Sequence, residues 1–176
     1  LKVASLGSVL AAALFFTGCA SQPSVALDPV GPAPMASANT DSGHGSLVVF
    51  SPLEAIDNLN AEISGQPSDD WEYSEYTILS LDGKRLKGVS NNAGTVQLHP
   101  QTIELPEGKY VIVAKADGDI HVTVPVVIAS HQTTVLHLDG NDFQPGETGF
   151  NQTNSVRLPD GRIVGWRAAA QNMPAS

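Results

Sequence analysis

Five histidines are the side chains of this sequence that could bind a metal ion, since imidazole nitrogens are common zinc ligands. They are His44, His99, His121, His131 and His137. Their spacing contains neither an HExxH motif nor another pairing that sets two nitrogens on one ion. On extended strands, His121 and His137 would point away from the face that their apolar neighbours occupy. We therefore predict ordinary surface histidines and no metal site.

Acidic residues crowd the stretch between positions 57 and 75. They are Asp57, Glu62, Asp69, Asp70, Glu72 and Glu75. A calcium loop needs about six to eight oxygens, usually from alternating acids around a central glycine, and this stretch lacks that pattern. The acids therefore predict a solvated acidic surface. A converging pair of carboxylates could instead serve a hydrolase, and Asp69 and Asp70 are the candidates for such an acidic site.

Three aromatic residues lie at the end of the same stretch. They are Trp71, Tyr73 and Tyr76, while Trp166 stands apart near the C-terminus. Flat rings flanked by acids can stack on sugars or dock a peptide, because they give a large contact area at little cost in side-chain entropy. Such rings also commonly cap the edge of a β-sandwich. We hold Trp71, Tyr73 and Tyr76 as possible ligand-binding residues, with packing as the alternative.

Catalytic motifs are missing from the sequence, and its charge argues against polyanionic partners. There is no GxSxG elbow and no Gly-rich phosphate loop, so we predict a protein that is not an enzyme and needs no cofactor. Eighteen acidic and nine basic residues give a net charge of −9, or −10 once Lys2 is removed with the apolar head. Phosphate binding needs clustered Lys and Arg, so neither nucleic acid nor an anionic lipid surface is expected.

The only cysteine, Cys19, follows a short apolar segment. Lys2 precedes an uncharged run over residues 3–16, as in the basic and apolar regions of an export signal. A spanning helix needs about 20 apolar residues, so an uncleaved membrane anchor is the weaker alternative for this shorter run. A lone cysteine excludes an internal disulfide, a Cys-rich zinc site and an iron–sulfur cluster. Acylation would occupy a thiol that is otherwise a liability in an exported protein.

The residues Phe16-Thr17-Gly18-Cys19 resemble the lipobox of bacterial lipoproteins. In that family an apolar residue, a small residue and Gly or Ala precede the cysteine that receives diacylglyceryl and becomes the new N-terminus. Leu is preferred in the family where Phe16 stands here. The resemblance implies a signal peptide over residues 1–18 and a lipid anchor on Cys19. Because Ala20 is not the Asp that marks inner-membrane retention, it also implies the outer membrane, facing the periplasm or the cell surface.

Composition divides the rest of the chain into three parts. Residues 19–45 are rich in Pro, Ala, Ser and Gly, which predicts a disordered tether that includes His44. Residues 46–140 carry the apolar alternation of a β domain. Residues 141–176 begin as a polar, Gly-rich loop and then predict a hairpin on Asp160-Gly161 and a frayed end.

Alternation of period two predicts short strands throughout the domain. The expected strands cover residues 46–50, 76–81, 85–89, 95–98, 102–105, 109–116, 121–128 and 133–138. Turn residues such as Asp82-Gly83 and Asp117-Gly118 separate them. A short helix over 52–60 is the exception, because Ser51-Pro52 supplies an N-cap and a first-turn proline. The fold class expected is mainly β: a single antiparallel β-sandwich of about seven strands.

The run Leu105-Pro106-Glu107-Gly108-Lys109-Tyr110-Val111-Ile112-Val113 resembles the turn-and-strand repeat of transthyretin-like and carboxypeptidase-regulatory-like sandwiches. In those families the strand is followed by a hairpin that returns to the same sheet, as Gly118 would allow here. The resemblance covers about residues 76–138. It implies a prealbumin-like or immunoglobulin-like fold and a non-catalytic accessory role, with no active-site residues to carry over.

These observations predict a lipid-anchored, non-catalytic accessory or binding protein of the cell envelope. Its partners would be the membrane, through the lipid on Cys19, and an unknown envelope protein or polysaccharide. A carbohydrate- or cell-wall-binding module that uses Trp71, Tyr73 and Tyr76 is the alternative. A hydrolase with an acidic site near Asp69 and Asp70 is a weaker one.

Overall fold

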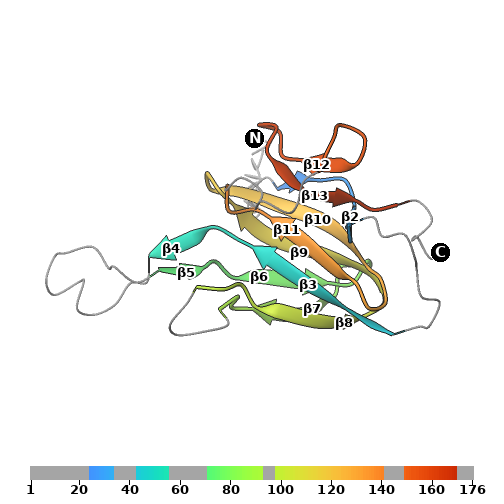
Figure 1. The fold of residues 1–176 in the computed structure, drawn as a ribbon. Coiled ribbons are helices and arrows are strands. Elements are labelled where there is room, and N and C mark those ends of the chain that lie inside the picture. Colours follow the sequence, from blue (N-terminus) through green and yellow to red (C-terminus); the bar gives the residue numbers. More distant parts are fainter. Residues whose placement is uncertain (1–23, 34–42, 56–70, 93–97, 141–148, 170–176) are drawn as a thin grey trace, which may run out of the picture.

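The computed structural model describes residues 24–33, 43–55, 71–92, 98–140 and 149–169 (Figure 1). Within these ranges the regular structure consists of thirteen strands. They form a sheet of eight strands, a sheet of three and a two-stranded ribbon. Thus the prediction of a mainly β, sandwich-like fold is confirmed.

The larger sheet follows the order β12-β13-β2-β10-β9-β6-β7, and β1 pairs with β10 beside β2. Its strands are β1 (Val25–Ala26), β2 (Val30–Gly31), β6 (Tyr76–Leu79), β7 (Arg85–Val89), β9 (Gly108–Ala116), β10 (Ile120–Ile128), β12 (Ser155–Arg157) and β13 (Ile163–Arg167). The longest pairing is the β9–β10 hairpin, which is antiparallel from Ala116 opposite Ile120 to Gly108 opposite Ile128. This hairpin forms the centre of the molecule.

The smaller sheet lies across one face of the larger sheet (Figure 1). Its order is β11-β3-β8, formed by β3 (His44–Phe50), β8 (Thr102–Pro106) and β11 (Thr133–His137). The ribbon of β4 (Leu53–Ala55) and β5 (Trp71–Tyr73) projects from one end of the sandwich. Only Glu107 separates β8 from β9, and residues 129–132 separate β10 from β11, so in both places the chain crosses between sheets within a few residues.

The sheets are mixed, whereas the sequence predicted an antiparallel sandwich. Three pairs are parallel: β1 with β10, β2 with β10, and β3 with β11. The crossings explain part of this difference. The chain leaves β10 for the other sheet instead of turning back on itself, so β11 lands beside β3 in the parallel sense.

The core between the sheets comes from alternate positions of the strands, as the period of two predicts. The side chains with essentially no exposed surface include Leu47, Val49, Ile78, Ile112, Val122, Val124, Val126 and Leu136. Full burial of one such side chain contributes about 1.5–3 kcal/mol. The hydrophobic contact between the sheets is therefore the main source of stability.

The segment 24–33 belongs to the larger sheet, so the predicted tether over residues 19–45 is wrong there. Val30 is fully buried, and Val25 and Leu27 contact the core. Arg167 Nη1 also donates to Asp28 Oδ2 at 2.6 Å. The cause is tertiary. One edge of β10 pairs with β9 and the other can accept further strands, and Val25, Leu27 and Val30 supply the apolar side chains that pack against the core there. At the other end of the predicted tether, β3 begins at His44, ahead of the domain boundary expected at residue 46.

The ends of the predicted domain also differ from expectation. Residues 53–55 of the expected helix form strand β4, because they pair with β5, which was not predicted. The rest of that helix, and residues 95–97 of an expected strand, lie outside the described ranges. The C-terminal hairpin on Asp160-Gly161 is confirmed, and β13 extends the larger sheet by pairing with β2. None of the described residues belongs to a helix that is long and apolar enough to cross a membrane.

Candidate functional site

The structure separates the three aromatic residues that were proposed as a ligand surface. Trp71 on β5 is 48% exposed. Tyr73 is half-buried and meets the Phe50 ring edge-on, with 6.3 Å between ring centroids. Tyr76 is only 3% exposed within the core, where burial raises the pKa of its phenol. Tyr76 therefore cannot share a binding surface with Trp71.

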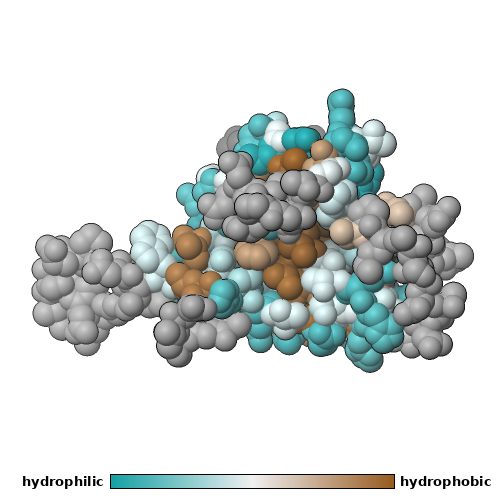
Figure 2. Space-filling view, in the orientation of Figure 1, coloured by the Kyte–Doolittle hydropathy of each residue, from teal (hydrophilic) through white to brown (hydrophobic). Residues whose placement is uncertain are grey.

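The outer face of the smaller sheet brings a different set of side chains together. Strand β3 buries Leu47 and Val49, so its alternate residues Ser46, Val48 and Phe50 face outward. The register places Thr133, Val135 and His137 of β11 beside them in that order. Along the two paired strands, the side chains on this face change from hydroxyl groups (Ser46 and Thr133) to valines (Val48 and Val135) and then to aromatic rings (Phe50 and His137). Figure 2 shows the resulting apolar area over β3 and β11, and a second one over β4 and β5.

His137 corrects the prediction that the histidines are ordinary surface residues. Its side chain points away from the core, as its position on the strand predicts, yet only 7% of the residue is exposed. The imidazole stacks on Phe50 with 4.8 Å between ring centroids and 2° between their planes. Because the chain covers the face on which His137 lies, an outward position is here a buried one.

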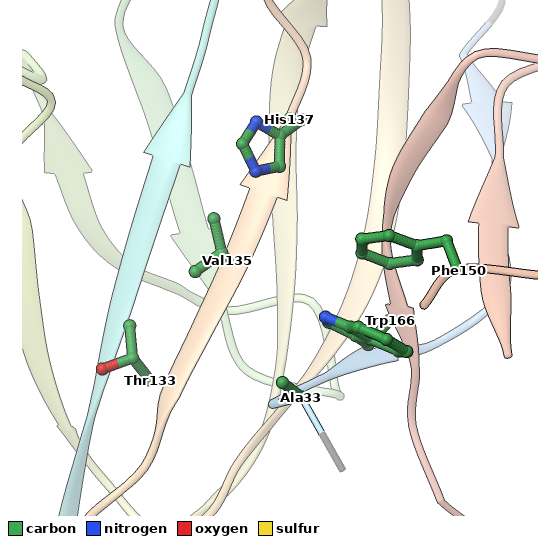
Figure 3. Close-up of a pocket in the computed structure, with 7 residues that line it drawn as sticks. Ala33, Thr133, Val135, His137, Phe150 and Trp166 are labelled. Atoms are coloured by element: carbon green, nitrogen blue, oxygen red, sulfur yellow. The ribbon is translucent and has the colours of Figure 1, made fainter. Parts of the chain in front are cut away.

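A groove lies between β11 and β13 on this side of the molecule (Figure 3). Its volume is about 130 Å³, and it is lined by Ala33, Thr133, Val135, His137, Phe150, Gly165 and Trp166. In Figure 3 the three β11 side chains form one wall, opposite the rings of Phe150 and Trp166. Those two rings stack with 4.0 Å between centroids and 25° between planes, which fixes the second wall.

Gly165 allows the two walls to approach so closely. A Cβ atom at this position would lie 2.8 Å from the Val135 carbonyl oxygen and 2.8 Å from Cγ1 of Val30. Both distances are shorter than a carbon atom tolerates, so only glycine fits without a shift of the neighbouring strands. The next residue, Trp166, then places its indole over the groove. No residue of the described chain accepts a hydrogen bond from the indole N–H, which points toward β11 in Figure 3.

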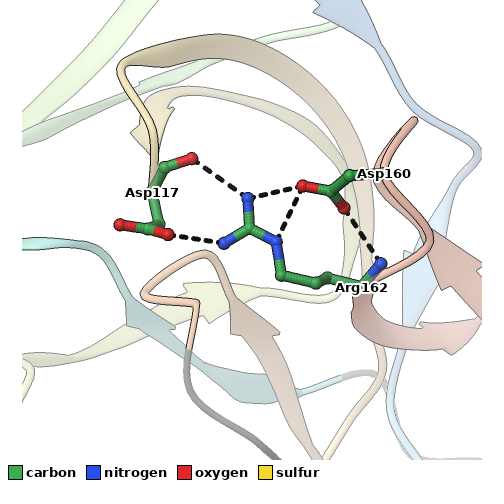
Figure 4. Close-up of polar contacts among 3 residues, drawn as sticks. All are labelled: Asp117, Asp160 and Arg162. Atoms are coloured by element: carbon green, nitrogen blue, oxygen red, sulfur yellow. Dashed lines mark hydrogen bonds and ion pairs between the residues drawn. The ribbon is translucent and has the colours of Figure 1, made fainter.

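An ionic cluster holds the wall strand β13 to the β9–β10 turn (Figure 4). Arg162 Nη1 donates to Asp117 Oδ2 at 2.7 Å, and Nη2 donates to the Asp117 carbonyl at 3.1 Å. Arg162 Nε also donates to Asp160 Oδ2 at 2.8 Å. The hydrogen bonds from Arg162 hold the pKa of the Asp160 carboxyl below its ordinary value. The cluster is structural, because every carboxylate in it is occupied by the same guanidinium.

The other predicted site residues fall in different places. Cys19, Asp69 and Asp70 lie outside the described ranges. Glu72 accepts a hydrogen bond from Asn92 Nδ2 at 2.8 Å. In the part of the chain that the structure describes, no group of three His, Cys, Asp or Glu side chains could hold a metal ion.

Sequence reasoning singled out Trp166 and considered His137 as a possible metal ligand, but it did not bring them together and missed the other residues of the groove. Phe50 and His137 meet only because β3 and β11 pair in one particular register. Phe150 comes from a stretch with no strand pattern. The usable signal was the pair Gly165-Trp166 on a predicted hairpin, since a glycine inside a strand often marks a close approach of another backbone.

Comparisons with known proteins do not assign the chain to a family. No family model matches it, and the searches of curated proteins and of solved structures return no significant match. The likeness to lipoproteins and to transthyretin-like sandwiches therefore stays a prediction from the sequence.

Proposed function

We propose that this protein is a lipid-anchored, non-catalytic binding protein of the cell envelope, which holds one protruding group of another envelope component in the groove between β11 and β13. The observation that carries the proposal is the groove itself. It is an apolar recess whose second wall is formed by two aromatic rings. The anchor would be the lipid on Cys19, with the outer membrane as its location.

The size and lining of the groove support capture of one group of a partner. A volume of about 130 Å³ accommodates one ring or one branched side chain. Pockets of this kind, filled by one anchoring residue of a partner, supply much of the binding energy at protein interfaces. The stacked Phe150 and Trp166 rings and the Gly165 contact hold the walls in place before a partner arrives, which lowers the entropic cost of binding.

The chemistry of the lining favours binding over turnover. Among the described residues of the lining, His137 alone has a titratable side chain, and its imidazole lies flat against Phe50. Covalent catalysis needs a nucleophile within hydrogen-bonding reach of a base that a third group orients. Besides the imidazole, the side-chain donors among the lining residues are Thr133 and the Trp166 indole, which belong to opposite walls in Figure 3. This arrangement suits orientation of a bound group.

Carbohydrate binding is the second candidate, and the Trp166 indole favours it. A sugar ring can lie on an aromatic face while its hydroxyls form hydrogen bonds at the rim. The indole N–H is available, and the rim at Thr133 continues into the polar row of Ser46 and Glu104, in which Ser46 Oγ donates to Glu104 Oε1 at 2.7 Å. The aromatic platform for a glycan would then be Trp166, while Trp71 stays exposed elsewhere.

The anchor is tested by intact mass and membrane partitioning of the protein made in its native host, beside Cys19→Ala. We expect the wild type to begin at an acylated Cys19 and to fractionate with the membrane, and the variant to lose the added mass. An unmodified Cys19 with the apolar head retained would refute the anchor, whatever the groove binds.

The groove is tested by a photo-cross-linking residue placed at Thr133, on the groove rim, in living cells. Thr102 is the matched control, because it is also exposed on the outer face of the same sheet but lies at its other edge. We expect a discrete adduct at position 133, absent at position 102 and lost when Trp166→Ala is added. A protein adduct supports the first candidate and a glycan adduct the second. Equal cross-linking at both positions would refute a groove-specific partner.

A further inference from the structure

The outer face of the larger sheet carries basic side chains, although the chain as a whole is acidic. On β10, β9, β6 and β7 the charged residues at outward positions are Arg85, Lys109 and Lys115, with His121 beside them. Lys115 is already paired with Glu54 and Asp119, each at 2.8 Å. Between them runs a flat row in which Pro125, Val111, Leu79 and Arg85 are neighbours on successive strands.

The β6–β7 hairpin concentrates these features at the margin of the face. Lys84, Arg85 and Lys87 lie close together on it, and none of the three forms an ion pair with a described residue. Lys87 pairs with core-facing Ile78 and so points to the other side of the sheet from Arg85, and the turn also carries the exposed Asp82. Leu81 in the turn is 63% exposed, and Leu86 on β7 is 49% exposed. Exposed leucines beside unpaired cations are typical of segments that rest in the interface of an anionic bilayer.

A strand from another protein is a poorer occupant for this edge. β7 is the last strand of its sheet, and its pairing with β6 is interrupted by a register shift between Ile78 and Leu79. Irregular pairing and lysines on an edge strand are features that prevent a further strand from adding. These features do not cover Leu81, Leu86 or the basic side chains, which stay accessible to a lipid surface.

The position of the lipid anchor brings the same face to the membrane. Five residue steps separate Cys19 from Ser24, so the connection spans at most about 18 Å. Ser24 Oγ lies 2.8 Å from Thr123 Oγ1, and Thr123 is an outward residue of β10. The nearby β9–β10 turn carries Asp117 and Asp119, whose charges are balanced by Arg162 and Lys115, so the turn adds no positive charge at this corner. The basic face is therefore the favourable surface within reach.

We propose that the outer face of the larger sheet docks on the anionic lipid surface that bears the anchor, with the β6–β7 hairpin as its second contact. The anchored segment enters at one corner of this face, and the hairpin lies at the diagonal corner, about 20 Å away and mostly across the strands. The smaller sheet and its groove then face away from the bilayer, toward a partner. The orientation rests on the proposed lipid anchor, whereas the affinity of the hairpin for anionic lipid does not.

The test uses the acylated protein in vesicles, with Leu81→Cys labelled by an environment-sensitive dye. Cys19 is the only native cysteine and its thiol is occupied once acylated, so the dye reports position 81 alone. Thr102→Cys on the smaller sheet is the matched control. On vesicles that contain phosphatidylglycerol, we expect quenching by spin-labelled lipid at position 81 and none at 102, and little quenching on phosphatidylcholine alone. Neutralising Lys84 and Arg85 to Gln should weaken the contact about 30-fold.

Salt dependence and the acylation state distinguish a failure of the lipid anchor from a failure of the hairpin contact. High salt should release the dye at position 81 while the protein stays on the vesicle, since salt screens charge but does not extract acyl chains. If mass analysis shows no acylation, the anchor fails, and salt-sensitive quenching of protein added to preformed anionic vesicles still decides on the hairpin. Equal signals at positions 81 and 102, or no quenching on any vesicle, would overturn the proposal and leave an acidic protein as the occupant of the hairpin.

Discussion

The outer faces of the two sheets follow the same alternation of residues, yet they differ in chemistry. The smaller sheet presents hydroxyls, valines and stacked rings, and β13 lies beside its edge strand β11 to form a groove. The larger sheet presents a flat row of apolar residues with basic side chains around it. The first face is shaped to hold one group of a partner, and the second is shaped to lie on an extended surface.

Two histidines show what creates this difference. His121 and His137 both occupy outward positions on their strands, and the sequence predicts surface exposure for both. His137 is nevertheless buried against Phe50, while His121 lies half-buried on the open face of the larger sheet. Alternation decides which way a side chain points. What lies next to the strand decides whether that direction leads to solvent or to a site.

The largest effect is expected where the smaller sheet is tied to the loop after β7. Asn91 is fully buried, with φ at 61°, and its Nδ2 donates to the Val49 carbonyl at 2.9 Å and to Ser51 Oγ at 2.8 Å. Asn91→Ala removes these bonds and places a Cβ residue without a compensating hydrogen bond in a left-handed conformation. We expect a loss of about 3 kcal/mol in the free energy of unfolding, measured in urea.

Asn92→Ala is the matched control, because Asn92 is less buried and one of its bonds is to the surface residue Glu72. Its cost should stay below about 1 kcal/mol. An equal loss of stability in the two variants would mean that the buried hydrogen bonds of Asn91 are not needed to hold the smaller sheet in place.

The second prediction compares one substitution on the two faces. Gly165→Ala forces a Cβ against backbone in the seam between β13 and β11, and we expect a loss of about 2 kcal/mol with a change in Trp166 fluorescence. Gly88→Ala on the larger sheet meets only the Arg85 guanidinium, which can swing into solvent, so its effect should stay within about 0.5 kcal/mol. Equal effects would show that the groove walls are not closely packed.

Much of the fold could be predicted because local pattern and tertiary structure agree. The alternation in β3, β9 and β10 selects the same residues that the core buries, and Asp-Gly pairs lie in the turns of three confirmed hairpins. These features need only the neighbouring residues of the chain. They are also the features that every competing arrangement of the strands would share.

The rest depends on partners that are distant in sequence. Residues 24–33 become strands only because β10 offers them an edge, and composition alone assigns them to a tether. The groove needs the parallel register of β3 and β11 together with the approach of β13. Tyr76 shows the converse error, since a ring grouped with Trp71 by sequence points instead into the core.

Tyr76 gives the third prediction, which concerns the interior between the two faces. Its hydroxyl is buried and has no hydrogen-bond partner among the described residues. Tyr76→Phe removes a polar group that lost its water on folding, so we expect the free energy of unfolding to rise by about 1 kcal/mol. If Tyr76→Phe instead lowers the stability in thermal and urea unfolding, the hydroxyl has a hydrogen-bond partner. Tyr76 would then return as a candidate site residue.

The smallest effect concerns the Arg162 cluster at the end of β13. Because hydrogen bonds from Arg162 hold the pKa of Asp160 below its ordinary 3.8, the ionised carboxylate stabilises the folded state at neutral pH. This contribution is complete above the ordinary pKa and is lost as the pH falls through the lower, folded-state value. The stability difference between wild type and Asp160→Asn should therefore stay constant from about pH 7 to 5 and shrink below about pH 4. In an Arg162→Met background the pH-dependent effect of the same substitution should be smaller but not absent, because the backbone N–H of residue 162 still donates to Asp160 Oδ1 at 3.0 Å. An effect of unchanged size would show that the Arg162 guanidinium does not lower the pKa of Asp160.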